Sequence, residues 1–147
     1  MKAEKLLGII DAVQDLVAFF NDPTNDQKML QQAGIPYSDN LLPIIVLLGS
    51  HKVATVGELA RALGRDHSSM SRKVASLQKQ GLLAATVSPT DLRSRQLSLT
   101  KKGAELFTTI TETRHQVMSQ ALAALSEDEV DQISASLKKL AEIVKRQ

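Results

Sequence analysis

The sequence of 147 residues contains no cysteine and no tryptophan, and only one tyrosine and three phenylalanines. The absence of cysteine excludes disulfide bonds, thiolate metal ligands, a catalytic thiol and a redox switch based on cysteine. Because aromatic residues are scarce, the core has to be built from Leu, Ile, Val and Ala, and their helical spacing favours a predominantly α-helical protein. At this length we expect one globular domain.

Long hydrophobic segments are also absent. The longest apolar run, residues 41–48, is interrupted by a proline and is too short to span a bilayer. The N-terminal segment contains the acidic residues Glu4, Asp11 and Asp15, whereas a signal peptide needs an uninterrupted apolar stretch. We therefore expect a cytoplasmic protein with no membrane partner.

The net charge of +2 hides an uneven distribution. Residues 52–102 contain ten basic and three acidic residues, a net charge of +7, whereas the rest of the chain contains eight basic and thirteen acidic residues, a net charge of −5. A basic middle between acidic ends is typical of a surface that binds a polyanion, although a solvated surface can show the same segregation.

Apolar residues at intervals of three and four predict an amphipathic helix over residues 3–20. A short helix over residues 26–33 comes next. The following helix contains a proline, which is tolerated only in a first turn, so we place its cap at Asp39 or Asn40.

Two helices joined by a tight turn follow. Thr55 and Glu58 form a capping box, Gly64 supplies a left-handed stop, and Asp66 is placed to cap a helix over residues 67–80. The apolar face of that helix is formed by Met70, Val74 and Leu77.

This arrangement is typical of a helix-turn-helix, whose second helix enters the major groove of DNA. Small serines near its start let the backbone approach the bases, and basic side chains donate to guanine edges or phosphates. The residues expected to contact DNA are Ser68, Ser69, Ser71, Arg72, Lys73 and Lys79. An ordinary helical hairpin with a solvated face is the alternative.

Alternating apolar residues predict two strands, 82–87 and 95–99, joined by a polar loop. A β-ribbon with a basic tip after a helix-turn-helix is a winged helix, and Arg93 is its candidate for the minor groove. We expect Asp91 to accept a bidentate contact from an arginine and to hold the tip in shape. A solvated hairpin whose charges only prevent edge pairing is the alternative.

Thr100 is expected to cap a long helix that ends near residue 124, and Ser126 and Glu129 form a second capping box. The helix after that box carries an apolar stripe at spacings of three and four, which resembles a short coiled-coil seam. The stripe consists of Val130, Ile133, Leu137, Leu140 and Val144.

Three segments carry a resemblance to a known family. They are residues 57–63, Gly-Glu-Leu-Ala-Arg-Ala-Leu; residues 69–83, from Ser-Met-Ser-Arg-Lys to Gly-Leu-Leu; and residues 91–103, where Asp-x-Arg-Ser-Arg leads into Leu-Thr-x-x-Gly. Together they resemble the MarR family of bacterial transcriptional regulators, over nearly the whole chain. The third segment is the most specific, because many regulators share the helix-turn-helix.

The resemblance implies a predominantly α fold with a small β-wing. Residues 39–100 would form a winged helix-turn-helix DNA-binding lobe, and residues 3–36 and 101–147 a helical dimerisation region. The implied function is a ligand-responsive repressor that binds a pseudo-palindromic, double-stranded DNA operator as a homodimer, with two recognition helices in successive major grooves.

Carried over by position, Arg93 would enter the minor groove, Asp91 would orient it, and Arg95 would lie near a phosphate. The alternative from another class is a winged-helix module that binds protein without binding DNA. Such a module needs apolar anchors on its recognition face, and the serine, arginine and lysine residues found there argue against it.

The family layout also implies a small effector, often aromatic or phenolic, bound between the dimer base and the DNA-binding lobe. We expect its pocket near Tyr37, Leu41, His51 and the start of the helix over residues 100–124, because Tyr37 and His51 offer polar atoms beside apolar residues.

No catalytic, metal or cofactor site is expected. The sequence has no Gly-rich phosphate loop, no nucleophile elbow and no convergent carboxylates. Glu112 and His115 have a usable metal-ligand spacing, but His51 and His67 lie on other elements, so solvated histidines are the better interpretation.

Overall fold

The protein is described by a computed structural model over residues 2–38 and 40–146. The described residues form seven helices and one two-stranded antiparallel sheet, which confirms the predicted fold class. The chain divides into two compact units, Met1–Thr113 and Arg114–Gln147. No helix among the described residues is both long and apolar enough to cross a membrane.

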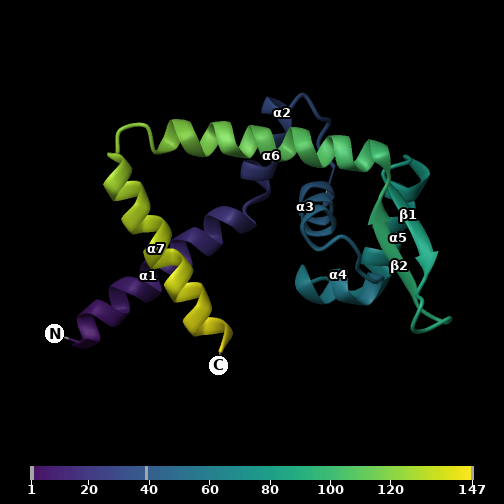
Figure 1. Cartoon of the computed structure of the whole chain (residues 1–147), viewed down its shortest axis with the longest axis horizontal. Coiled ribbons are helices and arrows are strands. Elements are labelled where there is room, and N and C mark those ends of the chain that lie inside the picture. Colours follow the sequence, from purple (N-terminus) through teal and green to yellow (C-terminus); the bar gives the residue numbers. More distant parts are fainter. Residues whose placement is uncertain (1, 39, 147) are drawn as a thin grey trace. The chain divides into compact units, whose positions relative to one another are not determined.

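Two helices open the first unit (Figure 1): α1 (Lys2–Asn21) and α2 (Pro23–Gln32). The first confirms the predicted helix over 3–20. The second begins three residues before the predicted 26–33, because Pro23 starts this helix instead of only ending the previous one. The Asp22 side chain accepts a hydrogen bond from the Thr24 backbone N–H at 2.9 Å and so caps it.

Helix α3 (Leu41–His51) follows, and its first turn accommodates the proline as predicted. Asn40 is the N-cap residue of this helix, which confirms one of the two predicted positions, but its side chain makes no capping hydrogen bond. Its φ of 59° is left-handed, whereas a capping side chain needs an extended backbone. The other predicted cap, Asp39, lies outside the described residues.

The helix-turn-helix consists of α4 (Val56–Ala62) and α5 (His67–Lys79). Its capping box is present as predicted: the Glu58 N–H donates to Thr55 Oγ1 at 3.1 Å, and the Thr55 N–H donates to the Glu58 carboxylate at 2.8 Å. Gly64 makes the turn with a φ of +61°, a backbone conformation that residues with a Cβ rarely adopt.

The hairpin is formed by β1 (Leu83–Val87) and β2 (Arg95–Leu99), and its register places Leu83 opposite Leu99. Ala54 pairs with Leu97 in a further antiparallel bridge, with N···O distances of 3.1 and 2.8 Å. The hairpin is thereby hydrogen-bonded to the segment that leads into α4. Its connecting loop forms the free end in Figure 1.

A single aliphatic cluster forms the core of this unit and includes the predicted inner face of α5. Gly49 of α3 allows a close approach to α6 (Lys101–Ala121), since a Cβ there would lie 2.3 Å from the Phe107 ring. The residues buried most completely are Leu30, Ile44, Ile45, Leu48, Leu59, Met70, Leu77 and Ile110.

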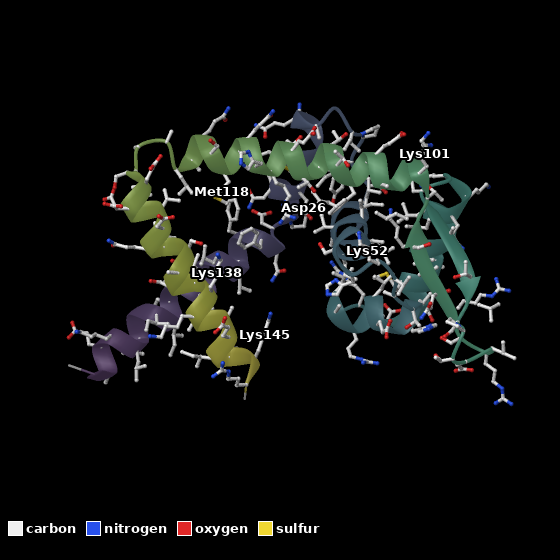
Figure 2. The ribbon with its side chains drawn as sticks, viewed as in Figure 1. Asp26, Lys52, Lys101, Met118, Lys138 and Lys145 are labelled. Carbon is white, nitrogen blue, oxygen red and sulfur yellow. The ribbon has the colours of Figure 1, made fainter. Side chains whose placement is uncertain are left out.

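The second unit contains the end of α6, which stops three residues before the predicted 124, and α7 (Glu127–Lys145). The predicted capping box of α7 is present, with the Ser126 N–H donating to the Glu129 carboxylate at 2.8 Å. No residue of α7 is buried, and Lys138 and Lys145 extend from it into solvent (Figure 2). A hollow of about 360 Å³ is lined by His115, Met118, Ser119, Leu122, Ala123 and Val130.

Candidate nucleic-acid interface

Helix α5 has two chemically different faces. Met70, Val74 and Leu77 are at most 3% exposed and join the core. The opposite face is open to solvent and presents the predicted residues Ser68, Ser71, Arg72 and Lys79. Since the inner face is fully packed, the outer face is held on a rigid element, which is what reading DNA bases requires.

The first turn of α5 is stabilised by Asp66. Its carboxylate accepts the Ser69 backbone N–H at 2.8 Å, and this bond, together with one from the Ser69 side chain, lowers the pKa of Asp66. The Ser69 hydroxyl also accepts a 3.4 Å hydrogen bond from the Arg72 guanidinium. Ser69 is half-buried and therefore shapes the start of the helix, while Ser68 and Ser71 are exposed.

Lys73 differs from the other basic residues predicted on this helix. Its side chain is half-buried, and its ammonium group donates to the Ser38 hydroxyl, in the segment between α2 and α3. The sequence predicted that Lys73 donates to guanine edges or phosphates. In the free chain this ammonium group is engaged by the protein itself.

The wing loop is closed by hydrogen bonds within its own backbone. The Ser88 N–H donates to the Ser94 carbonyl at 2.9 Å, and the Ser94 N–H donates to the Asp91 carbonyl at 3.0 Å. The Asp91 carboxylate accepts the Arg93 backbone N–H at 3.0 Å. The expected bidentate contact from an arginine to Asp91 is therefore wrong: the carboxylate turns back to its own loop, as short acidic side chains do in tight turns.

The tip formed by this loop presents Leu92 and Arg93 to solvent. Leu92 is 85% exposed, and Arg93 and Arg95 are exposed as well. Ser88, at the base of the loop, is buried and contacts the Thr90 hydroxyl at 3.1 Å. The wing thus places two arginine side chains on an ordered support, with Leu92 as a neighbour that sequence reasoning did not select.

The joint between α5 and α6 contains the predicted Thr100 cap, together with contacts that the sequence motifs did not predict. The Thr100 hydroxyl donates to the Gly81 carbonyl at 2.5 Å and accepts the Gly103 N–H at 3.1 Å. A Cβ on Gly103 would lie 2.2 Å from the Leu82 carbonyl oxygen, so only glycine fits there. The Lys102 ammonium donates to the Gln80 carbonyl at 2.9 Å, and its neighbour Lys101 is labelled at the same end of α6 in Figure 2. The Leu-Thr-x-x-Gly motif therefore holds the residues that follow α5 against the start of α6.

Comparison with known proteins agrees with this geometry. The model of the MarR family matches residues 42–94, which contain the helix-turn-helix and the wing loop. The transcriptional repressor MprA of Escherichia coli K12 is 31% identical over 118 residues, which cover 79% of this chain and 66% of the repressor, just under two thirds of its length. The HTH-type transcriptional regulator BilQ of Clostridium symbiosum is 31% identical over 111 residues, 76% of each protein. The chain belongs to the MarR family.

Solved structures of MarR proteins have the same fold. A MarR family protein from Bacillus stearothermophilus superposes with a TM-score of 0.81 over 99% of both chains, at 18% identity. NadR in complex with 4-hydroxyphenylacetate superposes with a TM-score of 0.64, at 26% identity, over 93% of this chain and 92% of that one. The chain has the winged helix of the MarR family, whose members are transcriptional regulators and not enzymes.

The three residues predicted to line an effector pocket in this MarR protein are not gathered together. Leu41 begins α3 and is only 4% exposed, whereas Tyr37, just before it, is 42% exposed. His51 ends α3, about 15 Å along the helix axis from Leu41, and its Nδ1 lies 3.1 Å from the Leu47 carbonyl oxygen. A single-ring phenolic acid is shorter than that separation, so it can contact one end of α3 but not both.

Metal ligands do not converge in the part of the chain that the structure describes. Among residues 2–38 and 40–146, no group of three or more His, Cys, Asp or Glu residues lies close enough to hold a metal ion. Glu112 and His115 therefore have no third ligand of these types among the described residues.

Proposed function

We propose that the chain is a ligand-responsive repressor that binds a pseudo-palindromic operator as a homodimer. The observation that carries this proposal is the outer face of α5, a row of small hydroxyl and basic side chains on a helix whose inner face is fully packed. Repression is proposed because blocking polymerase requires only tight binding, and because the E. coli relative is named a repressor.

The proposed contacts follow from side-chain chemistry. Ser68 and Ser71 let the helix backbone approach the bases, and Arg72 donates to a guanine edge or a phosphate. Lys79, two turns later, neutralises a phosphate. In the wing, Arg93 enters the minor groove, where the narrow groove concentrates negative potential, and Arg95 lies near a phosphate. Asp91 and Ser69 support the loop and the helix start that carry these residues.

The homodimer is proposed from apolar surface that the chain leaves uncovered. Soluble monomers rarely expose large contiguous apolar patches, yet α1 and α7 each carry an exposed apolar face. We assign residues 3–36 and 101–147 to the dimerisation region and residues 39–100 to the DNA-binding lobe. The exposed large apolar residues of α1 are Leu6, Leu7, Ile9, Ile10, Val13, Leu16, Val17, Phe19 and Phe20.

The test is a selection followed by a titration. Purified protein selects sites from random-sequence DNA, and the enriched site is titrated at several salt concentrations against random competitor. We expect a pseudo-palindrome with half-sites about 10 base pairs apart, and saturable binding with a steep negative salt slope. Equal, weak binding to selected and random DNA would contradict a specific regulator. An absence of salt-dependent binding to any DNA would favour the protein-binding module.

An aromatic or phenolic acid is the proposed effector class, because NadR, which shares the fold, binds 4-hydroxyphenylacetate. The effector favours one arrangement of the dimer, and operator affinity falls in proportion to that preference. We propose that the effector binds near Tyr37 and Leu41 at the start of α3. His51, at the other end of the helix, is a second candidate position, which the same molecule cannot contact at the same time. Unchanged operator affinity across a panel of phenolic acids, 4-hydroxyphenylacetate included, would argue against this effector class.

A further inference from the structure

One basic residue of the recognition helix is held by the protein. Lys73 donates its ammonium hydrogen to Ser38, which lies 35 positions earlier in the sequence. Ser38 is itself fixed at the start of α3, because its carbonyl accepts the Leu41 N–H at 3.1 Å. Arg72 and Lys79, on the same helix, are exposed.

We infer that Lys73 is a positioning residue, which fixes the orientation of α5 through Ser38 instead of neutralising a DNA phosphate. The inner face of α5 packs through apolar side chains, and such contacts are non-directional. A charge-assisted hydrogen bond is directional. Placed at the border between the buried and the exposed face, the bond from Lys73 to Ser38 limits rotation of α5 about its own axis, and rotation decides which side chains face the bases.

This inference rests on the proposed function of α5 as the recognition helix, and salt dependence separates the two roles of a lysine. Each phosphate contact makes the slope of log affinity against log salt concentration more negative by about 0.9, and the contact strengthens binding to any DNA sequence. A positioning residue strengthens binding to the operator only and leaves the slope unchanged.

The experiment compares Lys73→Met, Ser38→Ala and the double variant with Lys79→Met as the matched control. Methionine keeps the apolar stem of lysine and removes its charge. Affinities for the selected operator and for random DNA are measured at several salt concentrations. For Lys73→Met we expect operator affinity to fall about tenfold, with the salt slope and the affinity for random DNA unchanged. Ser38→Ala should act in the same direction, and the double variant should be no weaker than Lys73→Met.

The control behaves differently if Lys79 is a phosphate contact: Lys79→Met lowers the slope by about 0.9 and weakens binding to both DNAs. The same change in Lys73→Met, with Ser38→Ala equal to wild type, would overturn the inference. A measurement without DNA keeps the inference testable if no operator is found. Unfolding of the four proteins in the Lys73 and Ser38 cycle should show non-additive losses, and strictly additive losses would overturn the inference while leaving the proposed function untouched.

Discussion

The winged helix and the terminal helices use apolar residues in different ways. The sixteen buried hydrophobic residues of the core all lie between Leu30 and Ile110. Helix α7 contributes none of them, and on α1 every side chain that the structure describes is exposed. Apolar residues recur at helical spacing in both regions, but those of α1 and α7 are not buried by contacts within the one chain. An apolar stripe therefore indicates burial without indicating which molecule provides the cover.

The largest expected effect comes from a charge in the α7 stripe. Leu137→Glu should dissociate the homodimer, because it places a carboxylate where an apolar partner surface is proposed. Operator affinity should then fall about a hundredfold or more, since the two recognition helices no longer bind as one unit. Light scattering and DNA titration measure the two effects. Ala135→Glu, on the opposite side of α7, is the control and should remain dimeric, and a dimeric Leu137→Glu protein would show that the interface is misplaced.

A change in the packed region should act on stability instead of assembly. Gly103→Ala forces a Cβ to within 2.2 Å of the Leu82 carbonyl oxygen, and we expect it to lower the free energy of unfolding by about 3 kcal/mol. Gly57→Ala is the matched control, because the nearest atom to its added Cβ is the Thr55 hydroxyl at 3.9 Å. It should be neutral or stabilising by up to about 1 kcal/mol. Denaturant titration compares the two, and equal stabilities would contradict the tight joint.

A substitution in the wing should change DNA binding alone. Arg93→Ala should weaken operator binding by about 1–3 kcal/mol and leave the dimer and its stability unchanged, because the side chain is exposed and makes no hydrogen bond with the residues that the structure describes. Arg146→Ala removes the same charge outside the winged helix and should bind the operator like wild type. If Arg93→Ala also binds like wild type, the minor-groove assignment is wrong.

The smallest effect concerns the cap of α5. Hydrogen bonds from the Ser69 backbone and side chain hold the pKa of Asp66 below its ordinary value of 3.8. A carboxyl group with a lowered pKa stabilises the fold above its ordinary pKa, and this contribution is lost as the pH falls through the folded-state value. Asp66→Asn keeps a capping oxygen but does not titrate. The melting temperature of the wild type should therefore exceed that of Asp66→Asn near neutral pH, and the difference should shrink below about pH 4. A difference that is constant with pH would exclude the carboxylate as its cause.

Local signals accounted for most of the fold. The capping boxes at Thr55 and Ser126 and the left-handed turn at Gly64 were predicted because the partners lie within four residues of each other. The same local rules failed where two were in competition. Pro23 can end one helix or begin the next, and only the structure shows that it begins α2.

Contacts between distant segments were beyond the reach of sequence patterns. The hydrogen bond from Lys73 to Ser38 depends on how α5 lies relative to the segment before α3, and neither residue type predicts this bond. The Asp91 carboxylate had two possible donors, a guanidinium or its own backbone, and the short reach of aspartate favours the backbone in a tight loop. Ser68, Arg72 and Lys79 are exposed, as helical geometry predicts, because it places them opposite Met70, Val74 and Leu77.

The exposed tip of the wing makes the protein simple to observe. Leu92 is 85% exposed on an ordered loop, and the chain has no native thiol. Leu92→Cys therefore creates a single labelling position, and a fluorophore or spin label attached there reports on one wing in each chain. In a dimer the two labels form a symmetric pair, so one distance distribution, recorded with and without an effector, follows the separation of the wings directly.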